Sequence, residues 1–296
     1  MDVPSNKGYA MNMSKKTPPK VMSDEHNSHH AELRRARRDA MQGGANKNYP
    51  RRPHVARDNN DKLYLYGLHT VRQALANKNR KKLSLYATKN AVQRLEFDLM
   101  DSPEIEIIET LPKQLDKMVG SDAVHQGMIL EVEPIATKEL QDLKDCNLLL
   151  VLDQVTDPHN VGAIMRSAIA LGAGAIITTS RYSPVESGVL AKSASGALDL
   201  IDHIEVKNLA DCLETLNGNG FYTVGLDSEE AIPFEELKPQ SKIALVLGAE
   251  GKGLRERTRE TCNILAKLDM PGEIKSLNVS NAAALALYIS RQKLKL

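Results

Sequence analysis

Between Leu63 and Glu133, short apolar runs alternate with stretches in which apolar residues recur at helical spacing. The runs are four or five residues long and rich in Leu, Ile, Val and Tyr, which favours strands. This alternation predicts a small layered α/β domain over residues 62–133. Its strands are predicted at Leu63–Tyr66, Leu83–Ala87, Ile105–Ile108 and Met128–Val132, and its helices at Val71–Ala76, Ala91–Met100 and Leu111–Met118.

A continuous aliphatic run, Leu148-Leu149-Leu150-Val151-Leu152, begins a second pattern. Such a run predicts a strand that is buried on both faces, as in a parallel sheet. Strands and helices then alternate to the C-terminus, which predicts an open parallel α/β sheet with helices on both faces over residues 147–296. The further strands are predicted at Ala175–Thr179, Ile201–Val206, Phe221–Leu226, Ile243–Leu247 and Ile264–Leu268, and the helices at Val161–Leu171, Ser187–Ala194, Leu209–Leu216 and from Ala282 onward.

Two segments lack a repeating apolar pattern. Residues 1–61 are predicted to form a disordered basic tail, because they cannot bury enough apolar surface to offset the entropy of ordering. Residues 134–146, charged and poor in apolar side chains, are predicted to be a linker. The first 62 residues hold 13 Lys and Arg against 7 Asp and Glu, whereas the rest hold 26 against 31. A basic arm on an acidic body suggests a polyanionic partner, although a solvated tail without function would have the same composition.

Composition narrows the class of protein further. The chain has 296 residues, 42% of them hydrophobic, and contains no run of 18 apolar residues that would span a membrane. Its first 21 residues include no apolar stretch typical of a secretory signal. The three widely spaced cysteines, Cys146, Cys212 and Cys262, form no metal-binding pattern and are typical of reduced thiols. We therefore expect a cytoplasmic protein that binds neither a membrane nor a metal.

Sites in open parallel sheets lie at the carboxyl ends of the strands, where three polar loops are expected. The first loop follows Leu152 and runs from Asp153 to Asn160. Asn160 is a candidate N-cap for the next helix, and Arg166 lies six residues further on. A charge in so apolar a helix predicts either a carboxylate partner inside the protein or a phosphate partner outside it.

The second loop, Leu247-Gly248-Ala249-Glu250-Gly251-Lys252-Gly253-Leu254, is rich in glycine. It is not a P-loop, because Lys252 is followed by Gly253 and the glycine spacing is wrong. It is not a dinucleotide fingerprint either, because it comes near the end of the domain instead of after its first strand. Its glycines still allow the backbone to approach a ligand closely, with Glu250 projecting into the site.

The third loop begins with Pro271-Gly272 and leads into an alanine-rich helix. Its Ser276-Leu277-Asn278-Val279-Ser280-Asn281 segment holds polar residues of the kind that cap a helix start. Such a loop offers unpaired backbone groups beside fixed polar side chains, which suits a binding site. An ordinary capped terminal helix would have the same pattern.

Together, Asn160-Val161-Gly162 with Arg166, Leu247–Gly251 and Ser276–Ser280 resemble the three motifs of the SpoU/TrmH-type RNA ribose 2′-O-methyltransferases of the SPOUT superfamily. The resemblance covers essentially all of residues 148–296. Residues 63–133 also look like the small RNA substrate-binding domain that precedes the catalytic domain in the ribosomal-RNA branch of that family. The basic tail has no family equivalent.

The resemblance implies a SPOUT domain whose C-terminal segment forms a deep trefoil knot that binds S-adenosylmethionine. It also implies a homodimer in which the arginine of one subunit completes the site of the other. By motif position, backbone groups at Gly248, Leu268 and Leu277 would hold the methyl donor. The polar catalytic cluster would consist of Asn160, Arg166, Glu250, Ser276 and Asn278.

The implied reaction transfers a methyl group to a ribose 2′-hydroxyl of RNA, with a guanosine of large-subunit ribosomal RNA as the favoured acceptor. Because a guanidinium keeps its proton at neutral pH, we expect Arg166 to clamp a phosphate and orient the hydroxyl, with Glu250 as the rival proton acceptor. The same chemistry on transfer RNA and a non-catalytic RNA-binding or ribosome-assembly factor are the alternatives. The alanine-rich face around Ala283 is expected to pack near the dimer partner.

Overall fold

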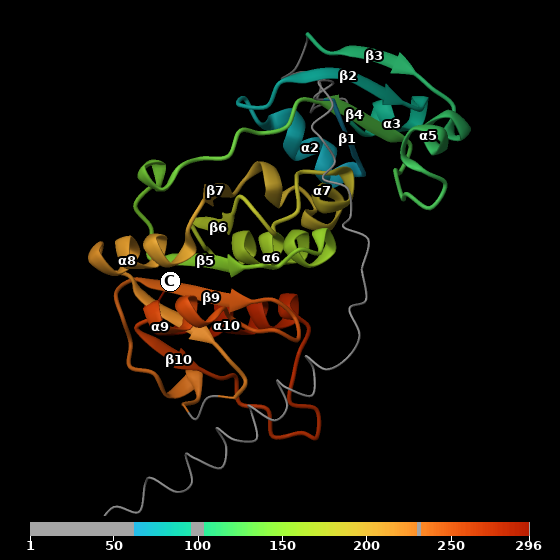
Figure 1. The fold of residues 1–296 in the computed structure, drawn as a ribbon. Coiled ribbons are helices and arrows are strands. Elements are labelled where there is room, and N and C mark those ends of the chain that lie inside the picture. The colour runs from blue at the N-terminus through green and yellow to red at the C-terminus, as the bar shows by residue number, and fades with distance from the viewer. Residues whose placement is uncertain (1–61, 96–103, 230–231, 296) are drawn as a thin grey trace, which may run out of the picture. The chain divides into compact units, whose positions relative to one another are not determined.

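The computed structural model describes residues 62–95, 104–229 and 232–295 (Figure 1). The predicted basic tail and the C-terminal part of the helix predicted at Ala91–Met100 lie outside the described residues. None of the helices in the described ranges has both the length and the apolar character needed to cross a membrane.

The N-terminal part of the described chain contains a four-stranded mixed sheet, in the order β1-β4-β2-β3. The central strand β4 pairs antiparallel with both β1 and β2, and β3 pairs parallel with β2. All five residues of β4 are buried, as its apolar sequence predicts. The elements are β1 (Leu63–Tyr66), α2 (Leu68–Ala76), β2 (Lys82–Ala87), α3 (Lys89–Arg94), β3 (Glu106–Glu109), α5 (Pro112–Val119) and β4 (Met128–Val132).

The larger sheet has six strands in the order β10-β8-β9-β5-β6-β7, and every neighbouring pair is parallel. The parallel sheet was predicted, and it is confirmed. Its elements, in chain order, are β5 (Leu148–Asp153), α6 (Pro158–Ala170), β6 (Ala175–Thr179), α7 (Gly188–Ala194), η2 (Ala197–Asp199), β7 (Asp202–Val206), α8 (Leu209–Gly218), β8 (Tyr222–Leu226), η3 (Phe234–Glu236), β9 (Ile243–Gly248), α9 (Glu256–Thr261), β10 (Ile264–Ala266) and α10 (Val279–Leu294).

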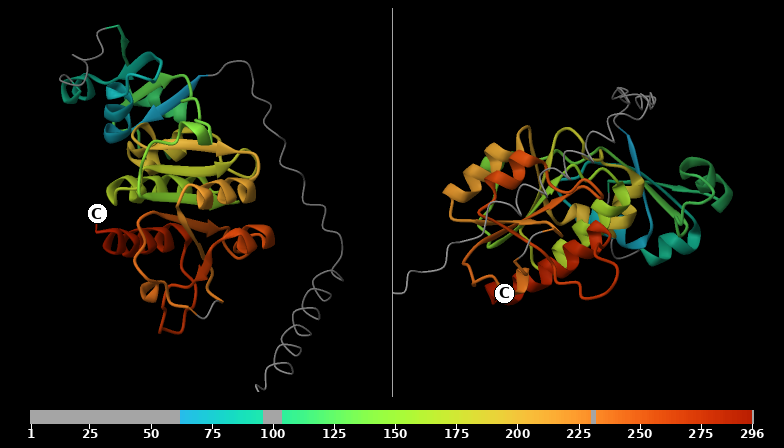
Figure 2. Two further views of the ribbon diagram at one scale, coloured as in Figure 1. Left: turned by 90° about the vertical axis from the view of Figure 1, so that its left-hand side faces the viewer. Right: turned by 60° about the horizontal axis from the view of Figure 1, so that its bottom comes forward.

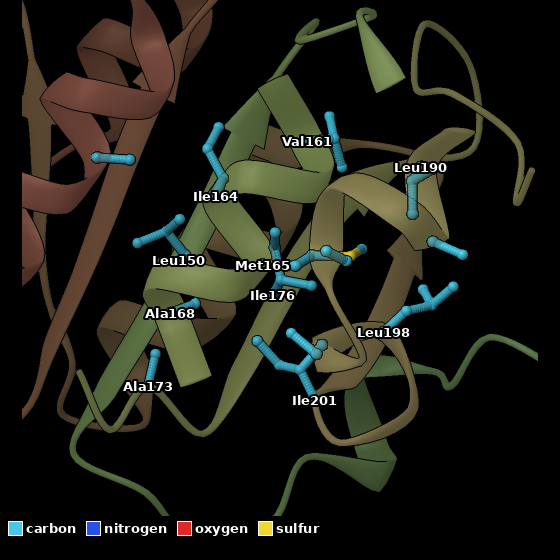
Figure 3. Close-up of a cluster of buried hydrophobic side chains, with 14 of the residues drawn as sticks. Leu150, Val161, Ile164, Met165, Ala168, Ala173, Ile176, Leu190, Leu198 and Ile201 are labelled. Carbon is cyan, nitrogen blue, oxygen red and sulfur yellow. The ribbon is translucent and has the colours of Figure 1, made fainter. Parts of the chain in front are cut away.

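Alternate residues of the central strands contribute to cores on opposite faces of this sheet. Leu150 belongs to the core formed with α6, α7 and α10, whereas Leu149 and Val151 belong to the core formed with α8. Figure 3 shows Leu150 and Ile176 beside the buried side chains of α6. Figure 2 shows helices on both sides of the strands, which explains why β5 is aliphatic from Leu148 to Leu152.

The segment predicted as a linker takes part in the larger sheet. Lys138 forms a parallel bridge with Ile204 of β7, where its N–H donates to His203 O at 2.9 Å and its carbonyl accepts from Glu205 N at 3.0 Å. A short 3₁₀ helix, η1 (Leu140–Asp142), follows. The physical reason is that β7 is an edge strand, whose open backbone groups take a partner from the passing chain.

The start of α6 corrects one prediction. The N-cap is Asp157, whose carboxylate accepts from His159 N at 3.0 Å, and the helix begins at Pro158. Proline suits the first helical position because its φ is already helical and its missing N–H is not needed there. Asn160 is therefore not the N-cap, and its amide is free to bond elsewhere.

The alanine-rich face of α10 also differs from expectation. Ala283 and Ala286 are fully buried and belong to the same core as α6 and β9. These two alanines pack inside the subunit and are therefore not available for direct contact with a dimer partner. The exposed apolar side chains of α10 are Leu285 and Tyr288.

A buried ionic network links the two sheet-bearing parts of the described chain. The Arg80 side chain is fully buried, and it contacts Asp199 through Nε at 2.6 Å and Glu186 through NH1 at 2.7 Å. NH1 also donates to the Glu133 carbonyl at 3.3 Å, and Asn77 Nδ2 donates to Asp199 Oδ1 at 3.0 Å. The two carboxylates and the Glu133 carbonyl compensate part of the hydration that the buried guanidinium loses, although its NH2 atom is buried without a hydrogen-bond partner in the described chain.

Candidate active site

Three loops at the carboxyl edge of the larger sheet meet at the carboxylate of Glu250. Its Oε1 atom accepts from Asn278 Nδ2 at 2.8 Å, from Asn160 Nδ2 at 3.2 Å and from the Val279 N–H at 3.3 Å. Asn278 Nδ2 also donates to Asn160 Oδ1 at 2.9 Å. We call Asn160, Glu250 and Asn278 the amide–carboxylate cluster. The sequence placed these three residues in one site, and the structure brings them together.

Each member of the cluster is positioned by the end of a regular element. Asn160 lies in the first turn of α6, Glu250 lies two residues beyond β9, and Asn278 is the N-cap of α10. The Asn278 Oδ1 atom accepts from the Ser280 N–H at 2.9 Å. Because the helix occupies its oxygen, the NH₂ group of Asn278 is left to donate across the loops.

The loop that carries Glu250 folds back on the end of β9. Gly253 N donates to Ala249 O at 2.8 Å, which closes a tight turn. A Cβ atom on Gly248 would lie 2.2 Å from the carbonyl carbon of Gly253. Only glycine fits at this position, which explains the Gly in the second motif without reference to a ligand.

A buried carboxylate anchors the far end of the same loop. Asp153, fully buried at the end of β5, accepts from Arg255 Nε at 2.7 Å and from the Arg255 N–H at 3.0 Å. Sequence reasoning missed this pair. One signal was available: Asp153 ends an otherwise aliphatic strand, and a buried carboxylate requires a partner.

A pocket of about 490 Å³ opens beside the cluster. Its walls come from residues 154–157 beyond β5, from Tyr182 beyond β6 and from Lys252 beyond β9. Asn160, Glu250 and Val279 also line it. The volume lies within the range of small-ligand sites in proteins. Sequence reasoning did not single out Tyr182 or residues 154–157 as site residues, because no motif marks them.

Two of the predicted catalytic residues lie apart from the cluster. Arg166 is exposed on α6 and does not line the pocket. Among the described residues it has no hydrogen-bond or ion-pair partner, so the predicted internal carboxylate is not found there. Ser276 is exposed and is likewise without a hydrogen-bond partner within the described chain.

The stretch from Leu268 to Leu277 supplies backbone groups that the protein leaves unpaired. In the described chain, the only hydrogen bond to this stretch runs from Lys275 Nζ to the Met270 carbonyl at 2.8 Å. Its apolar side chains Ile274 and Leu277 are exposed. Unpaired backbone groups next to exposed apolar side chains suit a ligand that has both polar and aromatic parts. S-adenosylmethionine is such a ligand. No cluster of His, Cys, Asp and Glu that could hold a metal ion occurs in the described ranges.

Comparison with known proteins identifies the family. Residues 147–288 match the SpoU rRNA Methylase family, and residues 64–137 match the family described as RNA 2′-O ribose methyltransferase substrate binding. The 23S rRNA (guanosine-2′-O-)-methyltransferase RlmB of Vibrio vulnificus is 34% identical over 242 residues, which covers 78% of this chain and 97% of that protein. The chain belongs to the SpoU family.

Other SpoU relatives are similar to the same degree. The 23S rRNA (guanosine-2′-O-)-methyltransferase RlmB of Pseudomonas aeruginosa is 36% identical over 241 residues, covering 77% of this chain and 96% of the relative. The namesake from Xylella fastidiosa is 41% identical over 191 residues, covering 62% of this chain and 76% of that protein.

Solved SpoU structures share the fold. The methyltransferase AviRb of Streptomyces viridochromogenes, in complex with the cofactor AdoMet, has a TM-score of 0.68 at 23% identity, over 79% of this chain and 91% of that chain. An AdoMet-bound rRNA methyltransferase of Sinorhizobium meliloti has a TM-score of 0.67 at 22% identity, over 79% and 88% of the two chains. The expected SPOUT fold class is therefore confirmed.

Proposed function

We propose that this SpoU protein transfers a methyl group from S-adenosylmethionine to a ribose 2′-hydroxyl of RNA, with a guanosine of large-subunit ribosomal RNA as the acceptor. The observation that carries the proposal is the amide–carboxylate cluster, in which one residue from each of three motif loops meets beside a pocket. The names of the similar proteins from Vibrio and Pseudomonas support the choice of ribosomal RNA over transfer RNA.

The division of labour along the chain follows from this proposal. Residues 62–133 bind the RNA substrate, and residues 147–296 form the methyltransferase domain, with the basic tail of residues 1–61 adding charge-dependent affinity for RNA. The C-terminal segment that carries the third motif forms the trefoil knot of the family. Action on ribosomal RNA places the protein in the cytoplasm.

The donor binds at Gly248, Leu268 and Leu277. Bound there, S-adenosylmethionine supplies an electrophilic methyl group on a sulfonium. The unpaired backbone groups of residues 268–277 bind its polar parts, and the exposed side chains of Ile274 and Leu277 cover its aromatic ring.

Within the site, Glu250 organises the two amides and is not the proton acceptor. Its Oε1 atom accepts hydrogen bonds from both amides and from the Val279 N–H. Asn160 and Asn278, held in this way, orient the acceptor ribose. Ser276 lies two residues before Asn278 and faces the reacting groups once the donor orders its loop.

Arg166 acts from the partner subunit of a homodimer. Its side chain is exposed and has no hydrogen-bond or ion-pair partner in the described chain, as expected for a residue that acts in the neighbouring subunit. The exposed Leu285 and Tyr288 of α10, which packs against α6, supply an apolar surface for that contact. The guanidinium then clamps an RNA phosphate and orients the 2′-hydroxyl.

The test measures donor binding and methyl transfer separately. We expect S-adenosylmethionine to raise the melting temperature of the protein, and a large-subunit ribosomal RNA transcript to gain one 2′-O-methylguanosine, located by mass spectrometry of nuclease fragments. Methylation of transfer RNA in place of ribosomal RNA would change the proposed substrate and leave the proposed reaction unchanged. Binding of RNA with neither stabilisation by the donor nor methylation would show a non-catalytic RNA-binding protein and overturn the proposal.

A further inference from the structure

The pocket beside the amide–carboxylate cluster is lined by both polar side chains and an aromatic one. Asn160, Glu250 and Val279 line it together with Tyr182, whose surface is 62% exposed. Three residues on from Tyr182, Val185 is 77% exposed. The three motifs account for Asn160, Glu250 and Val279 but give Tyr182 no role.

Two pocket residues adopt a backbone conformation that side chains disfavour. Gln154 has φ of 62° and Tyr182 has φ of 64°, in the left-handed region normally left to glycine. Both lie just beyond neighbouring parallel strands, β5 and β6, and both line the same pocket. Such conformations are unfavourable for residues with a side chain and concentrate at functional sites. Their coincidence at one pocket points to a binding role.

Two hydrogen bonds hold the turn that carries Tyr182. The Thr179 hydroxyl, buried at the end of β6, donates to the Arg181 carbonyl, and Ser180 N donates to the Val206 carbonyl at 3.0 Å. The backbone is therefore fixed while the ring stays exposed. Fixed aromatic rings beside charged groups are how proteins bind single nucleobases, because every base has a face that can stack.

A cation stands at the same pocket. Lys252 is exposed and, within the described part of the chain, has no hydrogen-bond or ion-pair partner. An ammonium left free on a glycine-rich loop is suited to an RNA phosphate. An aromatic ring, a side-chain amide and a cation thus line the same pocket as Asn160 and Glu250 of the amide–carboxylate cluster.

We infer that this pocket receives the acceptor nucleotide, taken out of its stack in the RNA. The base stacks on Tyr182 with the Gln154 amide at its edge, the ribose lies over Asn160 and Glu250, and Lys252 contacts a flanking phosphate. Enzymes that do chemistry on a base extrude its nucleotide in this way, and the same movement would present the ribose of that nucleotide to the cluster. The inference rests on the proposed function and assigns the acceptor side of that same site.

The experiment compares two variants of Tyr182 in the full chain. Tyr182→Phe keeps the ring, whereas Tyr182→Asn removes it but tolerates the left-handed backbone. We expect Tyr182→Asn to lower kcat/KM for the ribosomal RNA transcript by about 5- to 150-fold, which corresponds to the loss of one base stack. Tyr182→Phe and the matched control Val185→Asn should stay near the wild type, and calorimetric affinity for S-adenosylmethionine should be unchanged in all three.

A second measurement does not depend on methyl transfer. Guanosine 5′-monophosphate, followed by NMR titration, should bind the wild type and Tyr182→Phe but lose affinity at least fivefold in Tyr182→Asn. Equal binding of the nucleotide by all variants, or an unchanged kcat/KM in Tyr182→Asn, would overturn the pocket assignment. A wild type that binds the nucleotide through Tyr182 yet methylates no RNA would instead refute the proposed function alone.

Discussion

At the scale of single residues, the most informative atom is the Oε1 of Glu250. It accepts from the side-chain amide of Asn160 at the start of α6, and from the side-chain amide of Asn278 and the backbone N–H of Val279 at the start of α10. A carboxylate engaged in this way fixes geometry, and small displacements of catalytic groups lower rates steeply. Its role is therefore set by its acceptor capacity and not by its charge.

This distinction yields a prediction for two substitutions. Glu250→Gln keeps an Oε1 acceptor for the same three donors, so the variant should retain activity within about tenfold of the wild type, with an unchanged pH–rate profile. Glu250→Ala leaves the donors without an acceptor and should lose about 100-fold or more in kcat. Initial methyl-transfer rates measured between about pH 6 and about pH 9, in steps of about one pH unit, give the pH–rate profile of each variant and test this role of Glu250. Glu250 is the proton acceptor if the Gln variant is inactive and folded.

The sequence pointed to Asn160, Glu250 and Asn278 because they sit in recognisable motifs at predicted strand ends. It could not point to Tyr182 or Gln154, whose relevance depends on backbone angles that no residue pattern encodes. Arg255 was missed for a similar reason: its partner Asp153 is 102 positions away in the chain. The spacing of motif residues indicates which side chains lie close together along the chain. Which residues far apart in the chain become neighbours depends on the order of the strands in the sheet.

At the scale of elements, the packing of α6 against α7 controls where Asn160 lies. A Cβ atom on Gly162 would lie 2.6 Å from both the Leu190 carbonyl oxygen and the Ser193 Cβ atom. The two helices can therefore approach this closely only through a glycine. Because Gly162 is two residues from Asn160, any shift of the helix also shifts the amide.

The consequence is that alanine, normally the better helix former, should be harmful at this position. Gly162→Ala is expected to destabilise the fold by about 1–3 kcal/mol through overpacking. Gly218→Ala provides the control, because Gly218 ends α8 with open space around it and should gain up to about 1 kcal/mol. Urea unfolding of the two variants tests this, and equal stability changes would contradict the close-packing argument.

Element prediction succeeded where the apolar pattern was strong and failed where capping decided. The strand Leu148–Leu152 was recognisable from its aliphatic run, and the observed β5 ends one residue later. The start of α6 was misplaced because Asn160 and Asp157 are both good caps, and Pro158 decides between them. The bridge from Lys138 to β7 could not be predicted, because a backbone bridge to an edge strand leaves no trace in the pattern of side chains.

At the scale of the whole molecule, the exposed position of Arg166 makes a prediction about assembly. If Arg166 serves the partner's site, Arg166→Ala and Asn278→Ala dimers should each be inactive, while a mixed dimer carries one intact site. Random exchange should then restore about a quarter of wild-type activity, since about half of the dimers are mixed. Differently tagged variants, co-refolded and assayed for methyl transfer, provide the measurement.

Two outcomes would count against this arrangement. Arg166→Ala refolded without the second variant must show no recovery of methyl-transfer activity, which controls for the effect of refolding itself. If tagged mixed dimers form and remain inactive, the arginine works within its own subunit. If no dimers form at all, the exposed Leu285 and Tyr288 do not make the subunit contact.

The Arg80 network limits how such enzymes can be recombined. Its cation lies before the larger sheet in the chain, and its two carboxylates, Glu186 and Asp199, lie within the larger domain. A chimaera that joins residues 62–133 of a parent with the network to the rest of a parent without it inherits a buried cation without anions, and the reverse chimaera inherits two buried anions without a cation. Either fault is costly. Exchange of residues 62–133 between family members is therefore expected to succeed only when all three residues are transferred or already shared.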